Sequence, residues 1–433
     1  MIASPDWRGK RFAVLGLARS GAATVRALLA GGAEVVAWDS DAAKREALED
    51  AALMFADPEA IDLAGFDGLI VSPGVPLNRH PVAAKARAAG VPILGDIELF
   101  AQARATLPRH KVVGITGTNG KSTTTALIHH ILQTAGIPSL MGGNIGLPIL
   151  GQEPLPEGGV YVLELSSYQI DLTYSLDCDV AVLLNITPDH LDRYDGFAGY
   201  RASKLRLLDM QGWERIAIVA SEANGVGSAV RSMTTGAELT QWFSGDYATD
   251  FAEQQQHWPS LQGPHNAQNA WSARMACLAL GLSRAEIDAG LASFTGLPHR
   301  MELVATHNGV AFVNDSKATN PESTAPALAA FDRIHWIVGG KAKGADLDAC
   351  RPHFGHVARA YTIGEAGPVF AALLRDTMPV EEAGTLAAAV ASAAANAQPG
   401  DTVLLSPACA SFDQFRDFEQ RGDVFRAAVE AFR

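Results

Sequence analysis

The chain has few cysteines, no long apolar run and no segment resembling a secretion signal. Its 433 residues include four cysteines that lie far apart in the sequence: Cys178, Cys277, Cys350 and Cys409. This spacing lacks the pairing of a zinc site and the density of a disulfide-rich domain, so we expect reduced, buried thiols. No apolar segment reaches the roughly 18 residues that a membrane-spanning helix needs, and residues 1–10 lack the apolar core of a signal peptide. We therefore expect a cytoplasmic protein with no membrane partner.

Clustered positive charge is also missing. The formal net charge is −13, and no block of lysines and arginines stands out. Because duplex binding requires clustered cations, we expect no nucleic-acid partner. What the chain does have is 48% hydrophobic residues, enough to bury several cores, and its length predicts roughly three domains.

The most informative stretch is 111–125, KVVGITGTNGKSTTT. Its apolar start predicts a buried strand, and a glycine-rich turn leads into a helix that begins at Lys121 and ends near residue 135. Such a turn can cradle phosphate with its backbone N–H groups, with Lys121 on the β- and γ-phosphates and Ser122 on Mg²⁺. The glycine spacing is shorter than in the common phosphate-loop pattern, which places Gly where Ile115 stands. The alternative is an ordinary strand-to-helix turn with an exposed lysine.

The first hundred residues predict a strand, helix and strand of Rossmann type, with strands at 11–15 and 34–38. Ala18 replaces the middle glycine of the dinucleotide pattern, which argues against NAD and favours another nucleotide-containing ligand. Asp39 follows the second strand and could accept a hydrogen bond from a sugar or base, although its spacing favours a helix cap. A loop containing Gly74 follows a third strand and should face the same crevice.

The middle of the chain places polar groups after further buried strands. Glu164 near the end of an apolar strand is costly unless it meets a cation, which could be Mg²⁺, or it lies at a surface edge. Asn144 stands in a glycine-rich loop and could donate to a ligand or serve the turn itself. His190 follows another strand and suits a second metal position, a proton shuttle or a loop cap. Lys204 on a helix would ordinarily face solvent, and Asn269 could bind a purine edge from the first turns of a later helix.

The last third predicts a hairpin followed by another α/β unit. Arg300 precedes the hairpin and could donate to phosphate. Polar loops at 314–321, 339–344 and 406–411 follow apolar strands, where binding residues commonly gather. A helix carrying Phe412, Phe415 and Phe418 should then follow, with the phenylalanine stripe buried or partly in a substrate wall.

Seven stretches in order give the chain a resemblance to the Mur ligase family along its whole length. They are GTNGKS, ELSSYQ, NITPDHLDRY, the helix of Lys204, HNAQN, LPHRME and NDSKATNP. Three more, GDIELF, GGNIGLP and SPACASFDQFRDFEQRG, resemble the branch that adds D-glutamate to UDP-N-acetylmuramoyl-L-alanine through an acyl phosphate, using ATP and Mg²⁺ in peptidoglycan precursor synthesis. One departure is Asp41, which stands where the family pattern has an arginine.

The resemblance implies an α/β fold of three domains. Residues 1–98 would form a Rossmann-like domain for the UDP substrate, residues 99–298 a central domain with a P-loop ATPase-like parallel sheet, and residues 299–433 a Rossmann-like domain for the amino acid. We expect a monomer.

The resemblance also assigns roles to residues. The catalytic residues would be Lys121, His190, Lys204 and Asn144. The ATP site would comprise Gly117, Thr118, Asn119, Gly120, Lys121, Ser122, Thr123, Asn269, Arg300 and Asp315. The substrates UDP-N-acetylmuramoyl-L-alanine and D-glutamate would meet Asp39, Gly74, Asn144, His190, Lys317, Thr319, Lys343, Ser411 and Phe418. The metal ligands would be Ser122, Glu164, His190 and Lys204, the last as an N-carbamate.

Three other hypotheses remain open on sequence alone. The first is a ligase of the same family for another amino acid. The second is an NAD-dependent oxidoreductase built on residues 11–39, against which Ala18 argues. The third is a nucleotide-binding regulatory module without ligation, which would leave Glu164, His190 and Lys204 unexplained.

Overall fold

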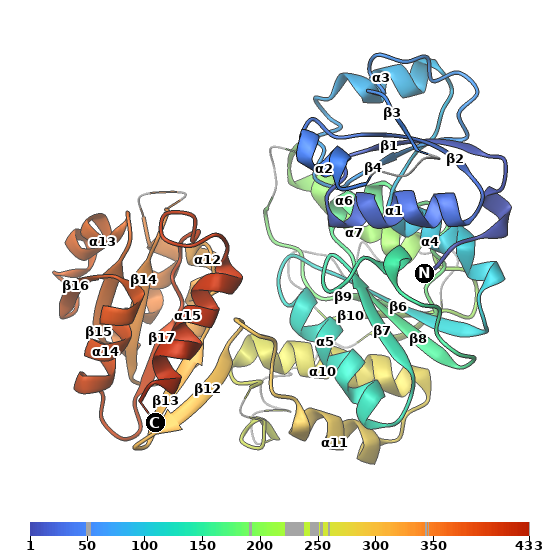
Figure 1. The fold of residues 1–433 in the computed structure, drawn as a ribbon. Helices are drawn as coiled ribbons and strands as arrows, with labels where there is room; N and C mark the ends of the chain where they lie inside the picture. The colour runs from blue at the N-terminus through green and yellow to red at the C-terminus, as the bar shows by residue number, and fades with distance from the viewer. Residues whose placement is uncertain are drawn as a thin grey trace. The chain divides into compact units, whose positions relative to one another are not determined.

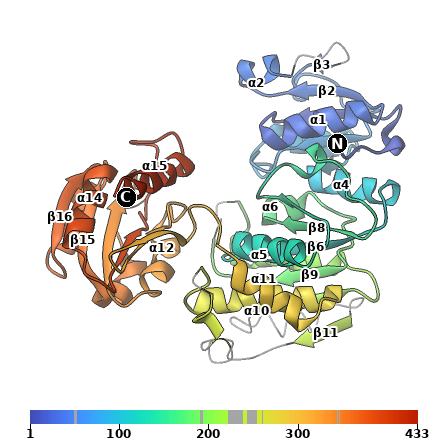
Figure 2. The same ribbon diagram turned by 60° about the horizontal axis from the view of Figure 1, so that its bottom comes forward.

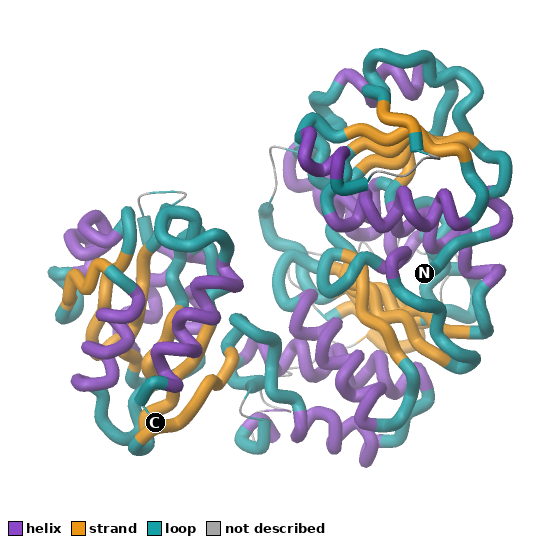
Figure 3. The backbone as a smooth tube through the Cα atoms, viewed as in Figure 1, coloured by secondary structure: helices purple, strands orange, loops and turns teal. Residues whose placement is uncertain are grey.

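The computed structural model contains three separate β-sheets, each flanked by helices (Figures 1 and 3). It describes residues 1–48, 53–189, 193–220, 238–242, 251, 254–258, 260–342, 344 and 346–432. The chain divides into two compact units. The first unit comprises residues 1–245 and 271–290, and the second comprises residues 246–270 and 291–433.

The N-terminal sheet has the strand order β3-β2-β1-β4-β5, and its strands are all parallel. The strands are β1 (Arg11–Leu15), β2 (Glu34–Trp38), β3 (Met54–Phe55), β4 (Gly68–Val71) and β5 (Ile93–Leu94). The helices are η1 (Pro5–Trp7), α1 (Arg19–Ala30), α2 (Ala42–Glu46), α3 (Pro81–Ala88), α4 (Asp96–Ala103) and η2 (Arg104–Thr106). The order reverses between β1 and β4, and ligands of such sheets bind at the carboxyl ends beside that point.

The two faces of β1 join different cores. Phe12 and Val14 belong to a core that continues into the central sheet, whereas Ala13 and Leu15 pack with Val36 on the other face. A strand buried on both faces is expected to be a continuous apolar run, as residues 12–15 are after the exposed Arg11.

The central sheet has the order β11-β10-β9-β6-β8-β7 and is also parallel. Its strands are β6 (His110–Thr116), β7 (Ser139–Gly143), β8 (Gly159–Glu164), β9 (Val180–Leu183), β10 (Ile216–Val219) and β11 (Glu238–Trp242). Its helices are α5 (Lys121–Thr134), η3 (Ile149–Gly151), α6 (Ser167–Asp171), α7 (Gly196–Asp209), α10 (Pro264–Leu280) and α11 (Arg284–Ser293). Helix α5 contacts β6, β7 and β8 (Figure 2), whereas α7 contacts β6 and β9.

The C-terminal sheet has the order β12-β13-β17-β14-β15-β16. Its strands are β12 (Glu302–His307), β13 (Val310–Asn314), β14 (Ile334–Gly339), β15 (Val357–Ile363), β16 (Val380–Gly384) and β17 (Thr402–Leu405). Its helices are α12 (Pro321–Leu328), η5 (Asp348–His356), α13 (Gly367–Leu374), α14 (Leu386–Asn396) and α15 (Phe418–Glu430). Strand β12 pairs antiparallel with β13, and the other pairs are parallel. The predicted hairpin is confirmed.

Two local predictions were wrong. The glycine-rich loop expected around Asn144 is shorter than predicted, because the two glycines before it, Gly142 and Gly143, end strand β7. The helix expected to carry three phenylalanines begins only at Phe418, because Asp417 caps it by accepting from the Gln420 N–H at 2.7 Å. Phe412 is therefore outside the helix and 69% exposed.

No helix in the described ranges has the length and apolar character needed to cross a membrane.

Candidate active site

The glycine-rich loop at 117–120 joins β6 to α5, as the sequence predicts. Gly117 and Gly120 have φ angles of 155° and 84°, in the region that favours glycine. A Cβ on Gly117 would lie 3.0 Å from the Cβ of Leu184 on the neighbouring chain segment. The loop can therefore turn tightly here and present the first N–H groups of α5 to an anion.

Asn185 fixes this loop from the end of the adjacent strand β9. Its side chain accepts from the Asn119 N–H at 2.9 Å and donates to the Asn119 carbonyl at 3.1 Å. The Thr118 hydroxyl donates to the Thr187 carbonyl at 3.2 Å and lies 3.2 Å from the Tyr200 hydroxyl. The sequence analysis did not identify Asn185 or Tyr200 as functional residues. Asn185 could have been identified, because it follows a buried strand.

Two lysines meet at one carbonyl of the loop. Lys121 donates to the carbonyls of Gly117 and Thr118 at 2.8 and 2.7 Å, and Lys204 donates to the same Gly117 carbonyl at 2.8 Å. Lys204 is only 2% exposed, and its ammonium lies 4.7 Å from the Tyr200 ring centroid. Burial, and then the charge of Lys121, lower the pKa of Lys204 well below its ordinary value. The expectation of a solvent-facing lysine is wrong, because α7 packs this face against β6 and β9.

Glu164 ends β8 directly beside the loop strand. It pairs with Ile115 of β6, and its Oε1 accepts from the Asn144 amide at 2.8 Å. Its Oε2 is buried and has no hydrogen-bond partner among the described residues. A Cβ on Gly143 would lie 2.1 Å from the Glu164 carbonyl oxygen, so glycine allows the two strand ends to approach. An unpaired buried carboxylate oxygen suits a cation, and oxygen ligands are the kind that Mg²⁺ prefers.

Asp39 and Gly74 lie together at the carboxyl ends of β2 and β4. They line a pocket of about 430 Å³ with Gly16 and Trp38. Asp39 accepts from the Leu17 N–H at 2.8 Å, and although burial raises its pKa, hydrogen bonds from Leu17 and Asp41 lower the pKa below the ordinary value.

The helix-cap hypothesis for Asp39 was wrong by two positions. Asp41 is the N-cap of α2, and its carboxylate accepts from the Ala43 N–H at 3.0 Å. This leaves Asp39 facing the pocket, with the Lys44 ammonium 3.4 Å from its carboxylate. The arginine that the family pattern has at position 41 is thus replaced by a residue that serves the helix.

In the second unit, Asp315 follows β13 and is buried. Its carboxylate accepts from the Ser406 hydroxyl at 2.8 Å and from the Met301 N–H at 3.3 Å. Burial raises the pKa of Asp315 to about 7, with smaller opposing effects that include the charge of Arg300. Arg300 is half-buried, so these two predicted nucleotide-binding residues lie within electrostatic reach of each other.

Lys317 and Phe418 are in direct contact. The Lys317 ammonium lies 3.8 Å from the Phe418 ring centroid, a cation–π geometry. Thr319 is half-buried two residues further on, and Ser411 is 2% exposed at the end of the loop after β17.

Arg421 on α15 makes hydrogen bonds to the loop after β13 and to the loop after β17. The sequence analysis did not identify this residue. It is fully buried, and its guanidinium donates to the Ser316 hydroxyl and carbonyl and to the carbonyls of Cys409 and Ala410. Burial lowers its pKa to about 10. No local sequence pattern distinguishes this arginine from the exposed Arg416 five positions earlier.

Asn269 lies on α10 and is buried. Its amide donates to Asn266 Oδ1 at 3.0 Å, three positions earlier on the same helix. Two predicted residues, His190 and Lys343, lie outside the described residues. Within the described ranges, no group of three or more His, Cys, Asp or Glu side chains could hold a metal ion.

Comparison with known proteins gives a match in each third of the chain. The MurD-like N-terminal domain of Mur ligases matches residues 10–95, the Mur ligase middle domain matches residues 115–277, and the Mur ligase glutamate ligase domain matches residues 299–409. The chain belongs to the Mur ligase family. The resemblance predicted from the motifs and the predicted α/β fold of three domains are both confirmed.

Named relatives match this Mur ligase over its whole length. The UDP-N-acetylmuramoylalanine–D-glutamate ligase of Novosphingobium aromaticivorans is 62% identical over 100% of this chain and 97% of its own. The enzyme of that name from Sphingopyxis alaskensis is 61% identical over 100% of this chain and 99% of its own. Among solved structures, the MurF ligase of Thermotoga maritima in complex with ADP has a TM-score of 0.59 at 14% identity, covering 100% of this chain and 98% of that one. At such identity the likeness concerns the fold.

Proposed function

We propose that this Mur ligase joins D-glutamate to UDP-N-acetylmuramoyl-L-alanine with ATP, as a cytoplasmic monomer in peptidoglycan precursor synthesis. The observation that carries the proposal is the 62% identity to a relative of that name over the whole chain. Lys121, Lys204 and Glu164 beside the phosphate loop support it independently, because phosphoryl transfer from ATP depends on positioned groups and cations.

The reaction needs an activated carboxyl group. The terminal carboxylate of UDP-N-acetylmuramoyl-L-alanine attacks the γ-phosphorus of ATP, giving an acyl phosphate and ADP. The amine of D-glutamate, after losing a proton, then attacks the acyl carbon, and phosphate leaves as the amide forms. Phosphoryl transfer depends on positioning and cationic stabilisation more than on covalent chemistry by the protein.

The chain supplies that positioning in the first unit. The backbone of residues 117–123 and the Lys121 ammonium hold the phosphates of ATP. Asp39 and Gly74 hold the UDP portion of the substrate, and Asn144 and His190 are the residues we assign to its acceptor end. Glu164 is already oriented by the Asn144 amide at 2.8 Å.

Mg²⁺ fits the donor set of this site. Ser122 and Glu164 would hold one ion and His190 a second, and Lys204 would support the metal site as an N-carbamate. When bound, Mg²⁺ neutralises the charge of the transferring phosphoryl group. The lowered pKa of Lys204 increases its neutral amine form, which is the form that reacts with CO₂.

The second unit supplies further residues for ATP and the residues for D-glutamate. Asn269 and Asp315 hold the adenosine and Arg300 the phosphates. The D-glutamate residues are Lys317, Thr319, Lys343, Ser411 and Phe418. Cationic and hydroxyl donors match the two carboxylates of this amino acid. We take residues 1–98, 99–298 and 299–433 as the three domains that carry these tasks.

The test is ligation by purified protein with ATP, MgCl₂, UDP-N-acetylmuramoyl-L-alanine and D-[¹⁴C]glutamate. Labelled nucleotide product and one phosphate per amide bond are expected. Replacing D-glutamate by L-glutamate, L-alanine or a diamino acid should abolish the product. Folded protein that yields no product, or that prefers another amino acid, would overturn the proposal.

A further inference from the structure

The loop of residues 72–78 follows β4 and contains Gly74, which we assign to the UDP portion of the substrate. The start of this loop is fixed to the N-terminal sheet. The Ser72 N–H donates to the Leu15 carbonyl at 3.0 Å, and the Ser72 hydroxyl donates to the Gly16 carbonyl at 2.9 Å. A Cβ on Gly74 would meet no atom of the described residues within 4 Å, so the middle of the loop is open. The contacts of its far end therefore decide how firmly the loop is held.

Arg193 contacts that far end. Its guanidinium donates to the Val75 carbonyl at 2.9 Å, across 118 positions of sequence. The same carbonyl also accepts from the Leu77 N–H at 2.9 Å. Val75 lines the pocket of about 430 Å³ that contains Asp39, and it also lines a pocket of about 560 Å³ with Arg193 and Tyr168. Val75 is thus shared by the two pockets, and Arg193 reaches it from the second one.

The guanidinium is itself held by aromatic rings of the central domain. Arg193 and Tyr168 are half-buried, and the guanidinium carbon lies 4.3 Å from the Tyr168 ring centroid, a cation–π geometry. The Tyr168 ring stacks on Tyr194, with centroids 6.1 Å apart and planes at 16°. The Tyr194 hydroxyl donates to Asp171 Oδ2 at 2.8 Å. Since Tyr168 and Asp171 both belong to α6, the stack is fixed to that helix at both ends.

Helix α6 follows the strand end that carries Glu164. Ser166 is its N-cap and forms reciprocal hydrogen bonds with Gln169, a capping box that fixes the start of the helix. Strand β8, which ends at Glu164, pairs with β6, the strand that leads into the phosphate loop. The contacts of Arg193 therefore join the UDP-side loop to the strand ends beside the phosphate loop.

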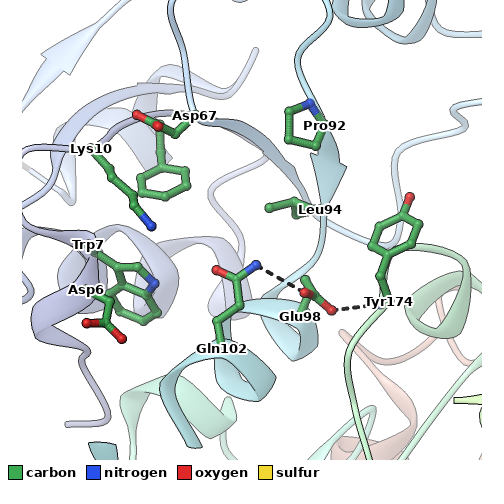
Figure 4. A pocket seen from close by; sticks show the side chains of 10 residues that line it. Asp6, Trp7, Lys10, Asp67, Pro92, Leu94, Glu98, Gln102 and Tyr174 are labelled. Atoms are coloured by element: carbon green, nitrogen blue, oxygen red, sulfur yellow. Dashed lines mark hydrogen bonds between the residues drawn. The ribbon is translucent and has the colours of Figure 1, made fainter. Parts of the chain in front are cut away.

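Another contact between the same parts of the chain lies in the pocket drawn in Figure 4. There Glu98 of α4 accepts from the Tyr174 N–H. This pocket opens at the amino ends of the N-terminal strands, since Asp67 lines it and directly precedes β4. Residues 72–78 follow the carboxyl end of β4. The Glu98 contact can therefore join the domains without holding the substrate-side loop, which Arg193 contacts directly.

We propose that Arg193 is a positioning residue for the UDP-carrying substrate, because it holds residues 72–78 in the conformation that binds the UDP portion. The inference rests on the proposed function. A loop that is held before the substrate arrives loses less conformational freedom on binding. The loop is needed equally in the ground state and in the transition state. Loss of Arg193 should therefore raise the KM for the UDP substrate and leave kcat nearly unchanged.

Steady-state ligation by Arg193→Met tests this proposal. Methionine keeps an unbranched apolar chain but has neither the donor nor the charge. The KM for UDP-N-acetylmuramoyl-L-alanine should rise about tenfold, the size expected for one charged hydrogen bond and one cation–π contact. The KM values for ATP and D-glutamate, and kcat, should change by less than about threefold. Arg193→Lys keeps the charge without the planar fork and should give an intermediate KM.

Arg87→Met is the matched control. Arg87 lines the same pocket as Arg193 from α3, and it is exposed. Its replacement removes an arginine from the pocket without touching the contact to Val75, so all three KM values should stay as in the wild type.

Variants of Tyr168 test the second half of the contact. Tyr168→Leu removes the ring and Tyr168→Phe keeps it, so the KM for the UDP substrate should rise more in the first variant. Adding Arg193→Met to Tyr168→Leu should raise this KM by less than about twofold further, because side chains in contact have non-additive effects.

Hydrogen exchange tests the loop without turnover, and calorimetry measures the Kd of UDP-N-acetylmuramoyl-L-alanine. Amides of residues 72–78 should exchange faster in Arg193→Met than in the wild type, whereas amides of β6 should not. A wild type that binds this nucleotide but forms no amide would contradict the proposed function, and the Kd of Arg193→Met would still test the inference. Unchanged KM, Kd and exchange in Arg193→Met, equal rises in all three KM values, or additive effects in the double variant would overturn the inference. Arg193→Lys provides the same comparison if Arg193→Met fails to fold.

Discussion

Replacing Arg421 by methionine should destabilise the second unit strongly. Methionine fills similar space but donates no hydrogen bond, so the carbonyls of Ser316, Cys409 and Ala410 lose the donor that now lies 2.8, 3.0 and 3.3 Å away. Each hydrogen bond to a charged group contributes roughly 1.5–3 kcal/mol. Methionine also removes the free-energy cost of burying a cation, which offsets part of this loss. We expect a net loss of about 3–5 kcal/mol in the free energy of unfolding.

Urea unfolding measures this cost. With a slope of about 2–3 kcal/mol per molar urea, the midpoint of the transition should fall by roughly 1–2 M. Hydrogen exchange read on residues 299–432 assigns the loss to the second unit. Arg416→Met is the matched control, because Arg416 lies on the same segment with 79% of its side chain exposed, paired with Asp417.

A second readout separates positioning from stability. Arg421→Lys keeps the charge but not the planar fork of donors, so the loops at 316 and 409–410 should loosen while the unit stays folded. The KM for D-glutamate should then rise about tenfold or more, with a smaller change in the KM for UDP-N-acetylmuramoyl-L-alanine. An unchanged midpoint in Arg421→Met, or equal effects on both KM values in Arg421→Lys, would refute the reasoning.

Three further outcomes are expected. Lys204→Ala should reduce kcat by roughly 10³-fold or more, since the loss of a group that stabilises transferring charge has effects of this size; short carboxylic acids should restore part of the rate, and an unaffected rate would remove Lys204 from the site. For Asp315 the folded pKa of about 7 exceeds the ordinary 3.8, so the native state binds more protons between these values. The free energy of unfolding should therefore fall as pH rises from about 4 to 7, by up to roughly 4 kcal/mol, and pH titration of Asp315→Asn should show a flatter dependence. Glu98 of α4 accepts from the N–H groups of Tyr174 and Ser175 at 2.7 and 2.9 Å. Glu98→Ala removes this acceptor, and thermal or urea unfolding should reveal a loss of about 2–4 kcal/mol; a wild-type midpoint would show that these bonds contribute little.

The sequence by itself determined the phosphate loop, the three α/β domains and the family. These features are local: Gly117 and Gly120 are needed where φ is positive, and Lys121 opens the helix that follows. The alternation of buried strands and helices can also be predicted from the pattern of apolar residues along consecutive positions. Such patterns can be recognised without knowing which residues from distant parts of the sequence are in contact.

Only the tertiary structure decided which charged groups are buried and what holds them. Lys204 meets the Gly117 carbonyl 87 positions away, and Arg421 meets Ser316 across 105 positions. Within the described residues, the buried Glu164 oxygen and the buried Trp7 N–H that have no hydrogen-bond partner are likewise properties of packing. A buried charge is stable only when it has hydrogen-bonding or charged partners. In this protein those partners are backbone groups far away in the sequence, so no short stretch of sequence predicts the contact.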